Sequence, residues 1–341
     1  MIREAIAKVV EGTDLSEEEM VSVMHEIMGG ESTPAQIGSF ITALRMKGET
    51  IDEISGAARV MREKATKVDG ADKGEILVDT VGTGGDASGT FNVSTTSAFV
   101  VAGAGVPVAK HGNRSVSSHC GSADVLEALG VNLNLNAPQI GACIRQVGIG
   151  FMFAPMLHGA MKHAIGPRRE IGIRTVFNIL GPLTNPANAN VYVLGVYTPA
   201  LIEKLANVLA RFSVMRALVV CGEGNIDEIT ITGETAVADL HNGKVTTYTI
   251  KPEDVGLKRA TLAEIQGGKT AEASAEQLRA VLRGEPGPRL DMVLMNSGAA
   301  LMAAGKAADL KAGVALARET IESGAATAKL EALIKFCRDA G

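Results

Sequence analysis

The sequence predicts an α/β protein, with a small all-helical N-terminal domain and a large α/β domain that has a mostly parallel central sheet. Three observations support this fold class. The chain has 341 residues, enough for two domains, and its first part carries regularly spaced helix signals. A polar, glycine-containing segment at residues 69–74 indicates a linker, and short apolar strands alternate with helical stretches beyond it. We therefore expect a helical domain over residues 1–70 and an α/β domain over residues 74–341.

The helical domain is predicted from three capping boxes. Ser16, Thr33 and Thr50 each have Glu or Gln three residues later, a pattern that satisfies the free N–H groups at a helix start. Apolar residues follow each box at helical spacing, and Gly29–Gly30 and Gly48 end the first two helices. Because the equal spacing of the boxes ceases after the third, we interpret these helix hairpins as a small helical domain rather than a solenoid.

The α/β domain is predicted from short apolar runs with helical stretches between or after them. The helix at Phe91–Ala102 is almost entirely apolar, so we expect it to be buried on all sides. The predicted strands are Ile76–Val81, Val106–Ala109, Val191–Tyr197, Leu218–Cys221, Ala236–Leu240 and Val245–Ile250. The other predicted helices are Ser122–Leu129, Ser274–Arg283, Asp291–Ala304 and Thr320–Cys337.

Composition restricts the partners and the location of the chain. A net charge of −5 and an aromatic content of 3% disfavour nucleic-acid binding, which needs a basic face and stacking rings. Four scattered cysteines, with no metal-ligand spacing, are typical of a reduced cytoplasmic protein. We also expect no signal peptide and no membrane contact, because the start of the chain is charged throughout and no apolar run is long enough to span a bilayer.

A glycine-rich segment, residues 81–96, follows the first predicted strand and opens the buried helix. Glycines let backbone N–H groups turn toward a large anion, and the helix N-terminus adds partial positive charge. Asn92, Ser94, Thr95 and Thr96 supply polar side chains, and the hydroxyl of Ser94 also suits Mg²⁺. The segment matches neither the dinucleotide-binding nor the P-loop pattern. We interpret it as a phosphate site; a plain strand-to-helix turn is the alternative.

Two further loops follow predicted strands. Residues 110–118 (KHGNRSVSS) combine two cations, an imidazole, an amide and hydroxyls, which indicates an anion site in an otherwise acidic chain. Asp227 and Glu228 are adjacent carboxylates, which bind Mg²⁺ when a phosphate completes the shell, although an exposed acidic loop is an equal alternative. Because ligands of open α/β sheets bind at the carboxyl ends of strands, these loops predict an enzyme for a doubly phosphorylated small molecule.

A fourth segment supplies a candidate carboxylate clamp. Arg168 has a planar guanidinium that suits a substrate carboxylate, but a structural salt bridge, such as one with Glu170, remains the alternative. His158 and His163 lack partners at zinc spacing, and the sequence contains no nucleophile elbow.

Six motifs together resemble the anthranilate phosphoribosyltransferase family, over essentially the whole chain. They are GTGGD at Gly82–Asp86, FNVST at Phe91–Thr95, KHGNR at Lys110–Arg114, GSADVLEALG at Gly121–Gly130, NPAN at Asn185–Asn188 and IDEIT at Ile226–Thr230. The resemblance implies a nucleoside phosphorylase/phosphoribosyltransferase-like fold, whose helical domain is completed by a segment near residues 160–185. It also implies a cytoplasmic homodimer that pairs through the helical domains.

The implied activity is a Mg²⁺-dependent pentosyl transfer in tryptophan biosynthesis. The phosphoribosyl group of phosphoribosyl pyrophosphate (PRPP) passes to the amine of anthranilate, giving phosphoribosylanthranilate and pyrophosphate. Because this aromatic amine is unprotonated near neutral pH, no strong general base is needed. The demanding event is departure of pyrophosphate through an oxocarbenium-like transition state, which electrostatics and positioning favour.

The resemblance also implies roles for particular residues. Lys110, His111 and Asn113 would be catalytic. Gly82, Asn113, His158 and Arg168 would contact anthranilate. Ser94, Asp227 and Glu228 would hold Mg²⁺. PRPP would bind Gly82, Gly85, Asp86, Thr90, Asn92, Val93, Ser94, Thr95, Lys110, His111, Gly112, Asn113, Arg114, Ser115, Val116, Ser117, Ser118 and Ser122.

One position departs from the family pattern, since His119 stands where Lys or Arg is expected after Ser118. This exchange predicts pH-dependent phosphate affinity. Two other interpretations remain open: a pyrimidine nucleoside phosphorylase-like enzyme, whose phosphate loop differs from KHGNR, and a non-catalytic nucleic-acid-binding homologue, which the net charge opposes.

Overall fold

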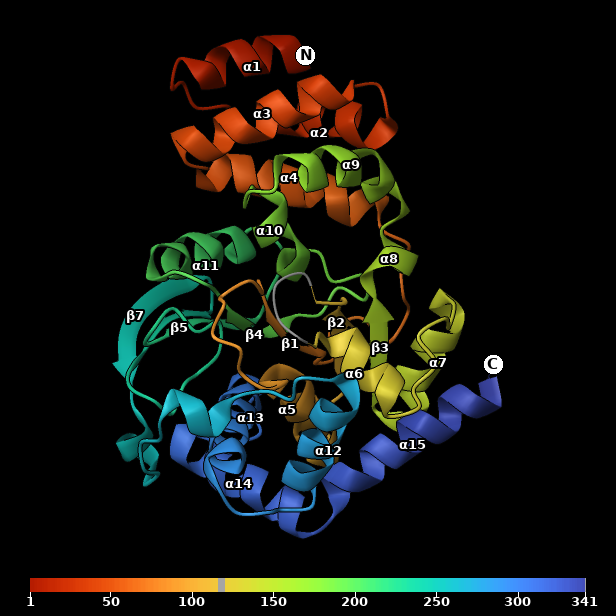
Figure 1. The fold of residues 1–341 in the computed structure, drawn as a ribbon, viewed down its shortest axis with the longest axis vertical. Helices are drawn as coiled ribbons and strands as arrows, with labels where there is room; N and C mark the ends of the chain where they lie inside the picture. Colours follow the sequence, from red (N-terminus) through yellow and green to blue (C-terminus); the bar gives the residue numbers. More distant parts are fainter. Residues whose placement is uncertain (116–119, 341) are drawn as a thin grey trace.

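Four N-terminal helices form a layer at one end of the molecule (Figure 1). The computed structural model describes residues 1–115 and 120–340. All three predicted capping boxes are confirmed, because each N-cap hydroxyl accepts the N–H of the third helical residue, whose side chain accepts the N-cap N–H in return. The helices are α1 (Ile2–Val10), α2 (Glu17–Gly29), α3 (Pro34–Lys47) and α4 (Ile51–Lys64).

A later helix, α9 (Lys162–Ile171), packs against α2 and α3 in the same layer (Figure 1). Two short elements, α8 (Ala154–Leu157) and η1 (Gly159–Met161), lead from the sheet up to α9, and α10 (Phe177–Leu180) and η2 (Gly181–Leu183) lead back. The chain therefore crosses between the helical layer and the sheet on both sides of α9.

The α/β part is built on one seven-stranded sheet in the order β3-β2-β1-β4-β5-β6-β7. Strands β1 to β5 are parallel to one another, whereas β6 pairs antiparallel with both β5 and β7. The sheet is therefore mostly parallel, as predicted. The strands are β1 (Val78–Gly82), β2 (Val108–Gly112), β3 (Ile149–Phe153), β4 (Val191–Gly195), β5 (Arg216–Gly222), β6 (Thr235–His241) and β7 (Lys244–Ile250).

Helices cover both faces of the sheet (Figure 1). Helix α5 (Val93–Gly103) is buried all round, as predicted, and packs on β1 beside α13 (Pro288–Ala303). Helix α11 (Ile202–Ala210) covers β5 and β6 on the opposite face. The remaining α-helices are α6 (Ser122–Ala128), α7 (Ala137–Val147), α12 (Ala271–Leu282), α14 (Leu310–Glu322) and α15 (Ala325–Ala340). Short 3-10 turns are η3 (Pro199–Leu201), η4 (Pro252–Val255) and η5 (Leu262–Ile265).

The structure corrects two predicted elements. The helix predicted at Thr320–Cys337 is divided between α14 and α15, because Gly324 adopts φ +78°, a left-handed conformation that ends a helix. The strand predicted at Val106–Ala109 instead runs through Gly112. Lys110 and His111 therefore lie within β2, paired with β3, a strand that the sequence reading did not predict.

The helical layer is fixed to the sheet by charged contacts as well as apolar packing. Arg211, just after α11, forms ion pairs with Glu17 and Asp52 of the helical layer. The Nε of Arg62, in α4, donates a hydrogen bond to the Leu183 carbonyl at 2.6 Å. Within the described ranges, every helix is too short or too polar to cross a lipid bilayer.

Candidate active site

The acidic loop after β5 meets the glycine-rich loop after β1 at the carboxyl edge of the parallel strands. The Gly84 N–H donates to Oδ2 of Asp227 at 2.6 Å, and the Ser94 N–H donates to Oε1 of Glu228 at 3.1 Å. Ser94 lies in the first turn of α5, so Glu228 accepts from the positive end of that helix. Two segments far apart in sequence therefore converge where the resemblance predicted a common site.

Glycines permit this close approach. A Cβ on Gly195, at the end of β4, would lie 1.6 Å from the Asp227 carbonyl oxygen. A Cβ on Gly82, at the end of β1, would lie 2.5 Å from Asp227 Oδ2. Because real Cβ atoms do not approach so closely, a side chain at position 195 would displace the acidic loop, and one at position 82 would displace the Asp227 carboxylate.

The acidic pair carries negative charge in a poorly solvated place. Burial and then the neighbouring Asp86 raise the pKa of the Asp227 carboxyl above its usual range. Burial and then Asp227 raise the pKa of Glu228 in the same direction, while the nearby Lys110 opposes the rise. Adjacent buried carboxylates with raised pKa values indicate a site that a cation stabilises.

The donor chemistry fits Mg²⁺ in a shell that is only partly made of protein. In the described part of the chain, no group of three or more His, Cys, Asp and Glu side chains is placed to hold a metal by itself. Asp227 and Glu228 nevertheless offer hard oxygen atoms beside the glycine-rich loop. Mg²⁺ commonly binds one or two carboxylates and takes its other ligands from phosphates and water, so the residues fit this ion.

Polar groups inside and outside the glycine-rich loop hold it in place. Oδ2 of Asp86 accepts the Ser88 hydroxyl at 2.5 Å and the Asp227 N–H at 3.3 Å. A guanidinium N–H of Arg174 donates to the Gly85 carbonyl, and the same guanidinium lies 4.4 Å from the Tyr197 ring centroid. Asp86 thus links its loop to the acidic loop.

Lys110 and His111 form the buried floor of the site. They are 3% and 4% exposed, and Lys110 Nζ donates to the His111 carbonyl at 3.1 Å. Burial lowers the pKa of Lys110, whereas the negative charges of Asp79, Glu228 and Asp227 oppose that shift. The positive charge of Lys110 favours negative charge at the acidic pair.

His111 and His158 are joined by their rings. The two Nε2 atoms lie 3.2 Å apart, within hydrogen-bond distance. Because a neutral imidazole carries a proton on only one ring nitrogen, one of the two Nε2 atoms donates to the other. Burial lowers the pKa of His111 to about 3 and that of His158 to about 4, so both rings are neutral near pH 7.

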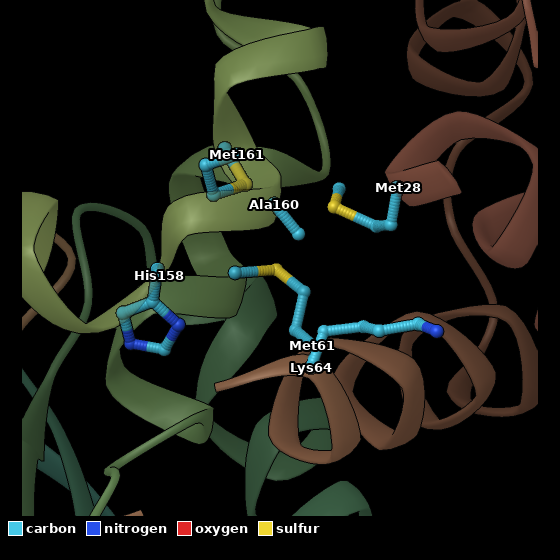
Figure 2. A pocket seen from close by; sticks show the side chains of 6 residues that line it. All are labelled: Met28, Met61, Lys64, His158, Ala160 and Met161. Carbon is cyan, nitrogen blue, oxygen red and sulfur yellow. The ribbon is translucent and has the colours of Figure 1, made fainter. Parts of the chain in front are cut away.

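Figure 2 shows His158 beside a small pocket where the helical layer meets η1. The pocket is lined by Met28, Met61, Lys64, His158, Ala160 and Met161. Its volume of about 10 Å³ has room for roughly one water molecule. It is therefore too small to be a substrate site.

The other predicted phosphate-binding residues lie around the same strand ends. Gly85 and Thr90 belong to the glycine-rich loop, and Asn92, Val93 and Thr95 to the start of α5. Gly112 ends β2. Asn113 and Ser122 meet through the Ser122 hydroxyl, which donates to the Asn113 carbonyl at 3.2 Å. Val116, Ser117, Ser118 and His119 lie outside the described residues.

Arg114 and Arg168, both predicted to bind substrate, have different surroundings. Arg114 is exposed and forms ion pairs with Asp124 and Glu127 of α6, so its charge is already compensated. Arg168 is half-buried in α9, with its guanidinium 5.1 Å from the Phe177 ring centroid. Burial lowers the pKa of Arg168. Within residues 1–115 and 120–340 it joins no ion pair, so Glu170 does not serve as its partner there.

Comparison with known proteins agrees with this arrangement. Residues 3–65 match the helical bundle domain of a glycosyl transferase family, and residues 74–327 match its α/β domain. The chain is 62% identical to the anthranilate phosphoribosyltransferase of Desulfotalea psychrophila, over 98% of this chain and 97% of that protein. The chain belongs to the anthranilate phosphoribosyltransferase family.

Solved structures of the anthranilate phosphoribosyltransferase family share the whole fold. The crystal structure from Thermus thermophilus has a TM-score of 0.92 at 46% identity, covering 98% of this chain and 99% of that one. The Saccharomyces cerevisiae enzyme, in complex with PRPP and Mg, has a TM-score of 0.90 at 28% identity, covering 99% and 98%.

Sequence reasoning missed several residues at the site. Gly195 lies in an ordinary apolar strand, and only its spatial neighbour Asp227 reveals why a glycine stands there. Arg174 lies far in sequence from the loop that it contacts. Asp79 could have been found from the sequence, because a charged residue inside a buried strand requires a polar partner.

The contact between Gly195 and Asp227 predicts the effect of Gly195→Ala. The added methyl cannot fit without moving the acidic loop, so stability should fall by about 1–3 kcal/mol or more. Urea unfolding measures this change. Gly38→Ala is the matched control, because its Cβ would lie 3.8 Å from Ile171 Cγ2, an ordinary contact, and should not destabilise. Equal stability of the two variants would contradict the packing argument.

The buried histidine pair predicts an unusual titration. Both rings should stay neutral from about pH 8 down to about pH 5, because their folded-state pKa values lie below the ordinary value near 6.5. The unfolded chain takes up these protons first, so this contribution to stability is present above about pH 6.5 and is lost as the pH falls toward 4. NMR of the imidazole C–H groups measures it; a midpoint near 6.5 for either ring would refute the assignment.

Proposed function

We propose that this chain transfers the phosphoribosyl group of PRPP to the amine of anthranilate, releasing pyrophosphate, in a Mg²⁺-dependent reaction of tryptophan biosynthesis. One observation carries the proposal beyond family membership. The acidic pair is bonded to the glycine-rich loop and to the start of α5, beside the buried Lys110. This arrangement provides oxygen ligands, backbone donors and a cation around one position, which suits a pyrophosphate with its metal.

The proposed roles follow the positions of the side chains. Asp227, Glu228 and the Ser94 hydroxyl would hold Mg²⁺. PRPP would lie against the glycine-rich loop, the start of α5 and the β2–α6 segment. Anthranilate would lie between Gly82, Asn113, His158 and Arg168.

The chemistry needs electrostatic help more than proton transfer. Lys110 would oppose the charge that builds on the departing pyrophosphate, and its buried position strengthens this effect. When bound, Mg²⁺ supplies further neutralisation of that leaving group. The neutral His111 and Asn113 would position the amine of anthranilate rather than deprotonate it, because the amine carries no proton that must be removed before attack. The proton that the nitrogen loses after the C–N bond has formed would pass to the departing pyrophosphate.

Three broader features stay predictions. The chain would form a homodimer through its helical domain, with residues 1–70 and the segment around α9 making up that domain. Residues 74–341 would form the catalytic domain. A cytoplasmic location would suit the free cysteines at positions 120, 143, 221 and 337.

Consumption of anthranilate fluorescence tests the proposal. Purified protein with PRPP, anthranilate and Mg²⁺ should lose the fluorescence signal, and omission of PRPP or Mg²⁺ should stop the loss. Nucleosides with inorganic phosphate should give no base release, which separates this activity from a pyrimidine nucleoside phosphorylase. Failure to consume anthranilate under these conditions would contradict the proposal.

Arg168 should act on one substrate only. A charge-assisted hydrogen bond contributes about 1.5–3 kcal/mol, so Arg168→Ala should raise the anthranilate KM roughly 10- to 100-fold. The PRPP KM should change little, and Arg168→Lys should restore only part of the loss, because an ammonium lacks the planar fork. Steady-state kinetics with each substrate varied measures both constants.

Arg169→Ala is the matched control for that prediction, since Arg169 is the exposed neighbour on the same helix. It should leave both Michaelis constants unchanged. A lower melting temperature for Arg168→Ala, with equal effects on both constants, would assign Arg168 a structural role instead.

A further inference from the structure

In the part of the chain that the structure describes, strands β1 and β2 pair with each other only at their start and diverge toward the site. Strand β2 pairs with β3 along its whole length, from Val108 with Ile149 to Gly112 with Phe153. Strand β1 pairs with β4 along its whole length in the same way. Between β1 and β2, in contrast, the described residues form one paired position, Val78 with Val108. The backbone of β2 around Lys110 therefore lacks its usual partner on the β1 side.

Two buried side chains occupy this gap. Oδ1 of Asp79 accepts the His111 N–H at 3.3 Å. Nδ2 of Asn185 donates to the Ala109 carbonyl at 2.9 Å and to Oδ2 of Asp79 at 2.7 Å. In a parallel ladder, one residue of the neighbouring strand would bond both of these backbone groups, which flank Lys110. Asp79 and Asn185 together replace that missing residue.

The Asn185 amide has one orientation that satisfies all its contacts. Its Oδ1 accepts the Ala187 N–H at 2.9 Å, while its NH₂ group serves two acceptors, Asp79 and the Ala109 carbonyl. Flipping the amide would set oxygen against oxygen at both acceptors. Asn185 is 1% exposed and Asp79 is fully buried, so water cannot replace either bond. The pair is therefore a fixed connection.

The same connection reaches the side chains of the site. Asp79 is close enough to Lys110 for its charge to oppose the lowering of the lysine pKa. The β2 backbone on either side of Lys110, and the charge beside Lys110, thus depend on Asp79 of β1 and on Asn185, which follows η2.

We propose that Asp79 and Asn185 are positioning residues, which hold Lys110 and His111 in register for phosphoribosyl transfer. The inference rests on the proposed function, because it concerns the same reaction. Opening β1 from β2 frees the carboxyl ends of both strands to face a substrate, and the side-chain pair keeps β2 from shifting where the ladder is absent. Neither residue touches substrate in this account, so their loss should change the geometry of Lys110 rather than remove a binding contact.

Asn185→Ala tests the proposal most directly. It removes the donor to the Ala109 carbonyl and the donor to Oδ2 of Asp79, so kcat should fall on the order of 10²-fold, as expected for a misplaced catalytic group. Both Michaelis constants should change much less than kcat. Asp79→Asn, which keeps the shape of the side chain and an oxygen for the His111 N–H, should lower kcat by about tenfold. The double variant should be no worse than Asn185→Ala, because the two residues act as one unit.

Thr184→Val is the matched control. Thr184 is buried beside Asn185, and its hydroxyl lies 3.0 Å from the Leu180 carbonyl and 3.1 Å from the Gly181 carbonyl, without reaching β2. It should lower the melting temperature but leave kcat unchanged. If Asn185→Ala and Asp79→Asn lose stability but keep the wild-type kcat, the positioning role is wrong. If Asn185→Ala does not fold, the kcat of Asp79→Asn decides in the same way. Inactive wild-type protein would instead refute the proposed function, so the two failures are distinguishable.

Discussion

The close approach of Asp227 to two strand-terminal glycines, by its main chain at Gly195 and its carboxylate at Gly82, determines the layout of the site. The acidic loop belongs to β5, yet it reaches across β4 to β1 because Gly195 and Gly82 present no side chain. From this position Asp227 accepts from the glycine-rich loop and Glu228 accepts from the start of α5. Strand β4 lies between β1 and β5, so the loop passes over the point between β1 and β4 where the strand order reverses. Open α/β sheets bind ligands at such a point.

A second theme is buried charge. Lys110, Asp79, Asp227 and Glu228 lie close together with little water, and burial shifts the pKa of each toward its neutral form. Mutual attraction across the cluster opposes these shifts, but three carboxyls face one ammonium. Such an arrangement is costly for stability in the absence of a further cation. It is understandable in a protein that binds a metal together with a polyanionic substrate.

Much of the fold could be predicted from local sequence. The capping boxes at Ser16, Thr33 and Thr50 and the apolar helix α5 depend on nearby residues, and each is confirmed. The break between α14 and α15 was missed because one glycine within a helical pattern is ambiguous until its φ is known. Strand β3 was missed as well, and with it the extent of β2, because a short apolar run fits helix and strand equally.

The site divides in the same way. Its loops were predicted because glycines, hydroxyls and charges gather within short segments. Gly195, Asn185 and Arg174 were not predicted as site residues, since each acts on a segment distant in sequence. Such contacts have no local signature. Asp79 is intermediate: its charge in an apolar strand signals a buried partner, but the sequence does not identify Asn185 as that partner.

The central claim is that the acidic pair supplies only part of a Mg²⁺ shell and that substrate phosphates supply much of the rest. Calorimetric titration of Mg²⁺, with and without PRPP and in the absence of anthranilate, tests it most directly, after subtraction of the heat of Mg²⁺ binding to free PRPP. The account predicts weak binding to the protein alone and much tighter binding with PRPP present. It also predicts that Asp227→Asn combined with Glu228→Gln abolishes the difference. Tight binding to the protein alone, or a difference that survives in the double variant, would contradict the account.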